Sequence, residues 1–516
     1  MKHFLIGMIC ICVVFKANAQ RIIYSEPDRD DIRDFKFEII GKIDNNLLVY
    51  KTANTNHYIS VYDEDMQQTD KIKIDYLTER VYNVDFVNYA DFAYMFYQYQ
   101  KKGVIYCMAV KIDGKGKKVG EPIELDTTNS REVQNNRIYS FVQSTDKSKI
   151  MFFKINTTLD KYHQITTILF DDKLNKMNKA TEAVPMRERN SFLSSFEVSN
   201  NGNFAFIKAI GTSGNDNINQ LVLIIKEAYA LNFNYINITK KEGVFLDEIK
   251  LKADNTNNRY IITSFFANKR RGDILGLYVT IYDNINHSEK LNTTVVFDNE
   301  FRTDAKTEGN IKNAFNDFFI KDIIVKKDGG FLLNAENEYN STRNNTNNFS
   351  RWDYLDYMNG PFGNSGFYNF GSPFYGFGSP FFNNPYGLYR SRSFYNITRY
   401  YADNIAIISL DSIAKPQWTN VIRKSQFDDR TDAFIGYGTF NAGNQIKYLF
   451  NVLEKNKLIL NEQSLTPSGQ IIRSSTLKNL DKGYEFMPRY AKQVGAYEFI
   501  VPCMYRSYLC FAKIDY

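Results

Sequence analysis

One pattern recurs along the chain and constrains its fold more than any other feature: an apolar segment that ends in an acid, followed by a polar turn. An aspartate suits this place because its side chain can bond its own backbone and begin a turn. Successive copies mostly lie 50 to 58 residues apart, with one longer gap from 283 to 411. The clear copies are YISVYD (58–63), YCMAVKID (106–113), ITTILFD (165–171), LVLIIKE (221–227), GLYVTIYD (276–283), NIAIISLD (404–411) and YLCFAKID (508–515). An eighth copy, KLILNEQSL (457–465) followed by TPSGQ, departs from the pattern.

Each copy has strand-like neighbours on both sides. Segments such as KIMFFKI and NFAFIKAI precede the copies, further strands such as FKFEIIGKI lie before those, and more polar strands such as DKIKID follow the acid. Four antiparallel strands in a repeat of this size are typical of a propeller blade. We therefore predict an all-β fold, a β-propeller of eight four-stranded blades, with seven blades as the alternative.

The two ends of the chain complete one another in this scheme. The last unit lacks a fourth strand because the sequence ends at Tyr516, and RIIYS (21–25) has no unit of its own. A strand from the N-terminus would complete the last blade, close the ring and remove the exposed sheet edges. The sequence thus predicts one propeller domain over residues 20–516.

The first residues, MKHFLIGMICICVVFKANAQ, have a polar start, an apolar run and a small-x-small signal at Ala17 to Ala19. This pattern predicts a signal peptide over residues 1–19 and an exported protein. An N-terminal membrane anchor is the less favoured alternative, because the apolar run is shorter than the roughly 20 residues that span a bilayer. No second long apolar run follows, so the mature chain is expected to have no transmembrane span. Its formal charge of about +4 argues against a nucleic-acid partner.

Three cysteines remain after residue 19: Cys107, Cys503 and Cys510. If Arg506 and Ser507 form a two-residue hairpin turn, Cys503 and Cys510 face each other across two strands. A disulfide is then geometrically allowed in an oxidising compartment, and two buried thiols are the alternative.

The sequence contains little that indicates catalysis. His57, His163 and His287 lie in different repeats, and no metal-ligand spacing, nucleophile elbow or phosphate loop is present. The recurring acids are explained by turns. We therefore predict a non-enzymatic protein with no catalytic residues, no metal and no cofactor. A carbohydrate-binding or carbohydrate-acting propeller, using carboxylates on its central face, is the alternative.

The long gap between repeats holds an unusual insertion, predicted at 340–401 within blade six. Two consecutive heptads, YNFGSPF and YGFGSPF (368–381), differ at one position only. They lie inside a run from Tyr357 to Tyr389 without a charged residue. Glycine and proline disfavour regular structure there, while aromatic side chains at this density are stabilised by burial. A loop of this length is usually functional or disordered, and partner binding is the reading we favour. The predicted partner-binding residues are Trp352, Tyr357, Phe367, Tyr368, Phe370, Phe374, Tyr375, Phe377, Phe381, Phe382, Tyr386, Arg390 and Arg392, with Arg399 also at the basic rim.

Segments such as KKDGGFLLNAENE and YADNIAIISLD resemble the strand–turn–strand units of secreted β-propeller repeat proteins of the bacterial cell envelope. With the leader and the aromatic insertion, the chain looks like the plug-type accessory subunits of the type IX secretion channel of Bacteroidota. That resemblance implies a periplasmic protein associated with the outer membrane. It would be a scaffold or binding subunit of an outer-membrane complex, which docks on or occludes a protein-export channel. It brings no catalytic residues with it.

Overall fold

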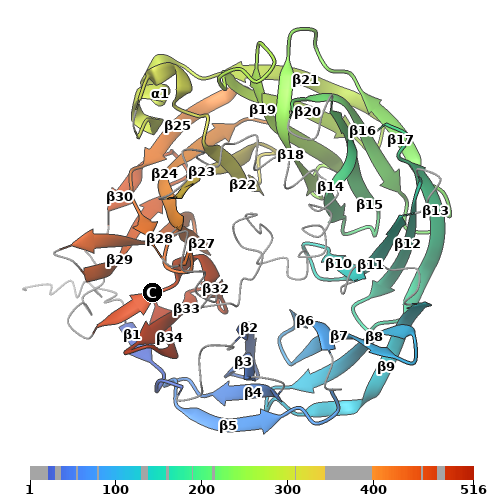
Figure 1. Ribbon diagram of the computed structural model, residues 1–516, viewed down its shortest axis with the longest axis vertical. Coiled ribbons are helices and arrows are strands. Elements are labelled where there is room, and N and C mark those ends of the chain that lie inside the picture. The colour runs from blue at the N-terminus through green and yellow to red at the C-terminus, as the bar shows by residue number, and fades with distance from the viewer. Residues whose placement is uncertain are drawn as a thin grey trace, which may run out of the picture.

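The computed structural model describes most of the chain after residue 20 as strands arranged around a ring (Figure 1). Residues 1–20 and 343–397 are the longest stretches outside the description. The described residues are 21–28, 36–53, 56–77, 81–129, 138–157, 162–188, 190–211, 216–307, 309–342, 398–429, 431–454, 457–473 and 483–516.

The first four blades are regular antiparallel sheets. Their strands are β2 (Lys36–Ile43), β3 (Asn46–Ala53), β4 (Asn56–Tyr62) and β5 (Gln68–Lys73); β6 (Val81–Asn88), β7 (Phe92–Lys101), β8 (Val104–Asp113) and β9 (Lys118–Asn129); β10 (Tyr139–Gln143), β11 (Lys149–Thr157), β12 (Tyr162–Asp171) and β13 (Lys176–Pro185); β14 (Ser191–Val198), β15 (Phe204–Gly211), β16 (Ile218–Lys226) and β17 (Asn234–Ile238).

The second four blades carry the additions to this plan. Their strands are β18 (Phe245–Asp254), β19 (Arg259–Ala267), β20 (Gly276–Asp283) and β21 (Ser288–Val296); β22 (Phe318–Val325), β23 (Phe331–Thr342), β24 (Thr398–Leu410) and β25 (Pro416–Ile422), with the short β26 (Phe427–Asp428); β27 (Tyr437–Ala442), β28 (Gln445–Glu454), β29 (Lys457–Leu465) and β30 (Ile471–Arg473); β31 (Tyr484–Phe486), β32 (Lys492–Gln493), β33 (Glu498–Tyr505) and β34 (Tyr508–Asp515). In the last blade the two short strands β31 and β32 both pair with β33, so together they take the place of one strand. The prediction of eight four-stranded blades is confirmed.

The N-terminal strand β1 (Arg21–Tyr24) closes the ring. It pairs antiparallel with β34 over all four of its residues and so supplies the outer strand of the last blade. Ser25 and Asp28 continue the contact through backbone hydrogen bonds of 2.8 and 2.7 Å to β34. The Asp28 carboxylate also lies 2.6 Å from the ammonium of Lys51 in the first blade. Residues 21–28 therefore join the last blade to the first.

Most of the acids at the ends of the third strands make the turns that the sequence predicts. Asp113 accepts the backbone N–H groups two and four residues further on, at 3.0 and 2.8 Å. The same pair of bonds recurs at Asp63, Asp171 and Asp411. Thr466 takes this place in the irregular seventh blade, where its hydroxyl accepts the N–H four residues further on at 3.0 Å.

The apolar core lies between neighbouring blades. Phe96 of blade two packs against Phe141 and Phe152 of blade three, with ring centroids 5.3 and 4.9 Å apart. Phe153, on the other face of the same blade, stacks on Phe196 of blade four at 4.6 Å. Each buried ring contributes on the order of 1.5–3 kcal/mol, so the faces shared by adjacent blades hold the ring together.

Two short helices interrupt the connection between blades five and six: α1 (Asn299–Ala305) and η3 (Ile311–Asn313). Asp298 caps α1 by accepting the N–H of Phe301 at 2.8 Å. Arg302 is buried and donates to the carbonyls of Ile274 and Leu275 at 2.9 and 2.6 Å. These helices are not predicted from the sequence, because segments of seven and three residues are too short to show a helical period.

Candidate functional site

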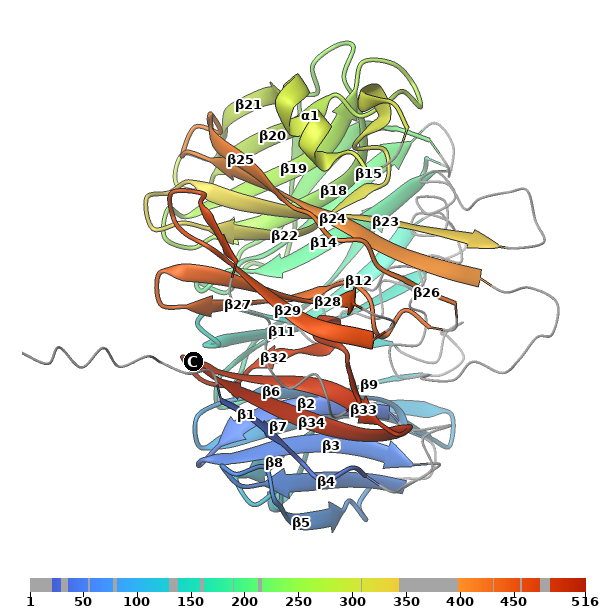
Figure 2. The ribbon, with the colours of Figure 1, turned by 90° about the vertical axis from the view of Figure 1, so that its left-hand side faces the viewer.

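The second and third strands of blade six extend beyond their own sheet. Pairing between β22 and β23 ends at Asn337, whereas pairing between β23 and β24 continues to Thr342 and Thr398. Residues 338–342 and 398–402 therefore form a two-stranded stem, which projects from one face of the ring (Figure 2). The stem flanks residues 343–397. The insertion is predicted at 340–401, so its first residues, 340–342, and its last, 398–401, belong to the paired strands of the stem.

Several contacts brace the stem. Tyr339 and Tyr401, which are opposite each other in the ladder, stack with ring centroids 4.3 Å apart and planes 10° apart. The short strand β26 adds a third strand beside β24. Arg399 makes two hydrogen bonds to the Asp429 carboxylate, at 2.6 and 2.9 Å, and lies 4.6 Å from the centre of the Phe427 ring. The sequence placed Arg399 at the rim of the insertion, and the structure places it in the stem.

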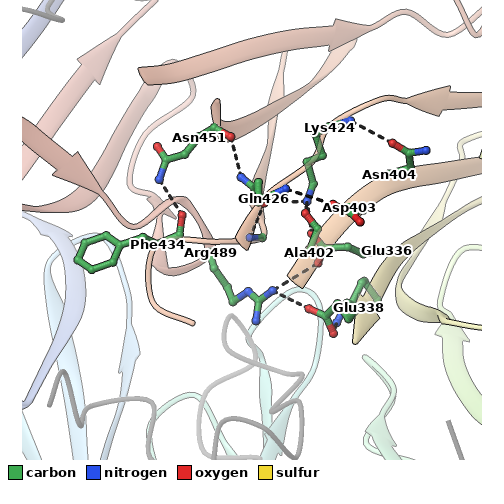
Figure 3. Close-up of polar contacts among 12 residues, drawn as sticks. Glu336, Glu338, Ala402, Asp403, Asn404, Lys424, Gln426, Phe434, Asn451 and Arg489 are labelled. Atoms are coloured by element: carbon green, nitrogen blue, oxygen red, sulfur yellow. Dashed lines mark hydrogen bonds and ion pairs between the residues drawn. The ribbon is translucent and has the colours of Figure 1, made fainter. Parts of the chain in front are cut away.

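A buried network of charges lies at the base of the stem (Figure 3). Glu336 and Glu338 are both on β23 and are 1% and 4% exposed. Lys424 lies 2.8 Å from Glu336, and the Arg489 guanidinium lies 2.6 Å from Glu338 and 3.5 Å from Glu336. Lys321 of β22 is paired with the other oxygen of Glu338. Removing one member of a buried pair costs about 3–5 kcal/mol, so these contacts fix the base firmly.

Hydrogen bonds connect this network to the seventh and eighth blades. The Lys424 ammonium donates to the Gln426 side chain at 2.8 Å, and Gln426 donates to the Asn451 carbonyl at 2.8 Å. The Asn451 amide then donates to the Phe434 carbonyl at 2.8 Å (Figure 3). It also donates to the Phe486 carbonyl at 2.7 Å. The base of the stem is thus bonded to three consecutive blades.

Glycine lets the backbone approach Arg489 closely. Gly436 has a φ of +84°, and a Cβ atom there would lie 2.3 Å from the guanidinium. Any side chain at this position would displace Arg489 from the network. Gly436 also donates its N–H to Gln426 at 2.8 Å, so the same backbone segment holds both polar groups.

Burial and pairing shift the pKa values in the network in opposite directions. Burial alone would raise the pKa of Glu338, but Lys321 and Arg489 outweigh it and hold the pKa well below the ordinary value. Burial lowers the pKa of Lys424, although Glu336 opposes this. The partly buried Asp432 has its pKa raised to about 7, mainly by burial and also by Glu338, with Arg489 opposing the rise.

A second polar group lies on the inner strands of blades four to six. Lys252 of β18 lies 3.6 Å from Glu197 of β14, and Asp322 of β22 also acts on the charge of Lys252. Burial raises the pKa of both acids, and the lysine lowers it. The lysine therefore partly neutralises two acids of the central face, the region that the carbohydrate alternative invokes.

The structure places the remaining predicted residues in two ways. The thirteen partner-binding residues from Trp352 to Arg392 lie within 343–397, outside the described part of the chain. Cys503 and Cys510 are described, are unbonded and lie directly opposite each other on β33 and β34. The two residues between these strands, Arg506 and Ser507, form the expected hairpin turn with φ values of 49° and 67°.

Sequence reasoning missed the charged network altogether. One signal was available: GGFLLNAENE places Glu336 and Glu338 at alternate positions of a strand that is otherwise apolar at its start. Buried acids of this kind require cationic partners. The partners Lys424 and Arg489 are 88 and 151 residues from Glu336 and Glu338 respectively, and no local pattern marks them.

The described residues contain neither a metal-ligand cluster nor a membrane-crossing helix. No group of three or more His, Cys, Asp and Glu side chains in that part of the chain is arranged to hold a metal ion. Likewise, none of the helices described there is long and apolar enough to cross a membrane.

The fold and the site define the class: an eight-bladed β-propeller whose sixth blade carries a braced stem and an insertion. No protein-family model matches the chain, and no curated protein sequence matches it.

Several solved structures are similar at low levels. Prolyl oligopeptidase B from Galerina marginata has a TM-score of 0.40 and 6% identity, covering 92% of this chain and 56% of that one. The polysaccharide lyase Uly1 has a TM-score of 0.34 and 9% identity, covering 84% and 89%. The cobalt-substituted apocarotenoid oxygenase of Synechocystis has a TM-score of 0.36 and 9% identity, covering 91% and 95%. This chain spans little more than half of the oligopeptidase, and likeness at these levels carries no argument about activity.

Proposed function

We propose that this protein is a non-enzymatic propeller scaffold that presents residues 343–397 to a protein partner in the bacterial envelope. One observation carries the proposal: the strands that flank this segment leave the ring as a braced stem. The stem is stacked at Tyr339 and Tyr401, and its base is held by buried ion pairs. A rigid support of this kind fixes where a binding segment meets its partner.

The composition of the presented segment indicates the chemistry of the partner. Between Tyr357 and Tyr389 it is rich in phenylalanine, tyrosine and glycine and has no charge. Buried aromatic anchors dominate the energy of many protein interfaces, and arginine is common beside them. We infer that the aromatic side chains enter an apolar cavity of the partner, with Arg390 and Arg392 at its rim.

The leader and the envelope-protein resemblance support a partner at the outer membrane. The partner we favour is a protein-export channel of the type IX kind. The protein would dock on this channel, or occlude it, from the periplasmic side. The pairing of the buried acids near the stem supports a structural use of those charges, in keeping with a protein that catalyses no reaction.

The test compares affinity purifications from detergent-solubilised envelopes, read by mass spectrometry. In the first variant, an Asn-Gly turn replaces 343–397 and joins Thr342 to Thr398, which leaves the paired stem in place. The matched control keeps the length of the segment but replaces its aromatic residues by serine. Circular dichroism and thermal unfolding of all three proteins establish that the ring is retained.

An outer-membrane channel that accompanies the intact chain, and is lost in both variants, is the expected result. If the serine control retains the channel, the aromatic anchors are not the binding chemistry. If the intact chain purifies alone, the scaffold proposal is contradicted. Glycan binding should then be tested against the central acids Glu197 and Asp322.

A further inference from the structure

Two cysteines face each other in the blade that closes the ring. Cys503 on β33 is paired with Cys510 on β34, and their Sγ atoms lie 3.1 Å apart. The pairing cannot slip easily, because Arg506 and Ser507 both adopt positive φ values in a two-residue turn. Directly opposite residues in a hydrogen-bonded antiparallel pair have Cα atoms roughly 5.5 Å apart, a spacing that a disulfide bridges.

The third cysteine provides an internal comparison. Cys107 is also buried, but it lies opposite Gln98 on one neighbouring strand and Asp126 on the other. It therefore has no cysteine at the position where a cross-strand bond would form. Among the described residues, one cysteine pair meets the geometric requirement and one thiol does not.

We propose that Cys503 and Cys510 are the site of a cross-strand disulfide bond, formed by exchange with a disulfide-carrying oxidant. The bond would join the second and third strands of the last blade, and the third strand is the one that receives β1. The proposal does not depend on the function of residues 343–397.

The reaction balances as two successive exchanges. One cysteine loses its proton, attacks the oxidant disulfide R–S–S–R and forms a mixed disulfide, which releases the first R–SH after protonation. The second cysteine loses its proton and attacks the protein sulfur of the mixed disulfide, which releases the second R–SH. The two cysteines are oxidised by two electrons in all, and the oxidant is reduced to two thiols.

The burial of both thiols indicates when this exchange takes place. Cys503 and Cys510 are 0% and 1% exposed, packed where the seventh and eighth blades meet. Burial also raises the pKa of Cys503 well above its ordinary value, so the thiolate that reacts is scarce in the folded protein. The bond therefore forms while the last blade is still open, before the ring closes.

The first experiment determines the state of the thiols in the full chain, exported with its own leader into an oxidising periplasm. Acid quenching, alkylation and proteolysis are followed by peptide mass spectrometry. The expected result is a peptide that contains Cys503 and Cys510 and has lost two hydrogen atoms, with Cys107 alkylated. Alkylation of Cys503 and Cys510 in all molecules would overturn the proposal.

The second experiment tests the timing and uses oxidised glutathione as the oxidant. The reduced full chain is exposed to it either during refolding or after folding is complete. We expect the bond to form at least about tenfold faster during refolding, because the native thiols are inaccessible. Equal rates would overturn the order of events.

Dithiothreitol should lower the Tm of the oxidised wild type but not that of the Cys503→Ser/Cys510→Ser variant. Should that variant fail to fold, the effect of dithiothreitol on the wild type alone decides: no shift in Tm would contradict a stabilising bond.

Discussion

At the scale of the residue, the most informative groups are the charges buried beside the stem. Glu336 and Glu338 are paired with Lys424, Arg489 and Lys321, so each buried carboxylate faces an opposite charge. Pairs of this kind add little net stability, but they are costly to disrupt. Their contribution is therefore to define one arrangement of the strands at the base of the stem.

The raised pKa of Asp432 predicts that the free energy of unfolding falls as the pH rises. Burial raises its pKa to about 7, whereas an aspartate in the unfolded chain ionises near pH 3.9. Between about pH 4 and 7 the folded state holds a proton that the unfolded state has lost. The free energy of unfolding therefore decreases through this window, by roughly 1–3 kcal/mol from this group.

Asp432→Asn removes this contribution, so its free energy of unfolding should depend less steeply on pH than that of the wild type. Urea denaturation at intervals between pH 4.5 and 7.5 (about the window of titration) measures the difference. Asp328→Asn, at a carboxylate that is 61% exposed, is the matched control and should keep the wild-type slope. Identical slopes in the two variants would show that Asp432 does not hold a proton in the folded state.

At the scale of the element, the acid-terminated strand and its turn are the repeated unit of the molecule. At Asp63, Asp113, Asp171, Asp283 and Asp411 the carboxylate replaces water as the acceptor for two backbone N–H groups. The turn is therefore determined by about five consecutive residues. This local determination explains why the pattern is visible in the sequence without any knowledge of the ring.

Asp411→Ala should lower the free energy of unfolding by about 1 kcal/mol, because two turn N–H groups lose their acceptor. Asp411→Asn keeps a side-chain oxygen at the same place and should cost clearly less. Chemical denaturation of both variants beside the wild type measures the two losses. Equal losses would mean that the negative charge, and not the hydrogen bonds, stabilises the turn.

At the scale of the whole molecule, ring closure depends on residues 21–28. They pair with β34 and place Asp28 against Lys51, whose side chain is 1% exposed. Without them the last blade has an open edge and Lys51 loses its carboxylate. An open edge favours aggregation, and an unpaired buried charge costs about 3–5 kcal/mol.

Removal of residues 21–28 should lower the Tm by about 5 °C and promote association between molecules. A synthetic peptide of sequence RIIYSEPD should restore the Tm when added in excess, and a scrambled peptide of the same composition should not. Differential scanning calorimetry with light scattering measures both effects. An unchanged Tm after the removal would mean that the ring is stable without its closing strand.

The sequence by itself determined the propeller class, the closing strand and the turns, and it favoured eight blades over seven. The strand period, the terminal acids and the missing last strand are local features, and Arg21–Tyr24 pairs with β34 as predicted. The tertiary structure alone decided where the charges meet. Glu338 and Arg489 are 151 residues apart, and they come together only because the closed ring brings blade eight towards blade six. Strand formation follows from short-range chemistry, whereas the pairing of buried charges depends on the geometry of the complete ring.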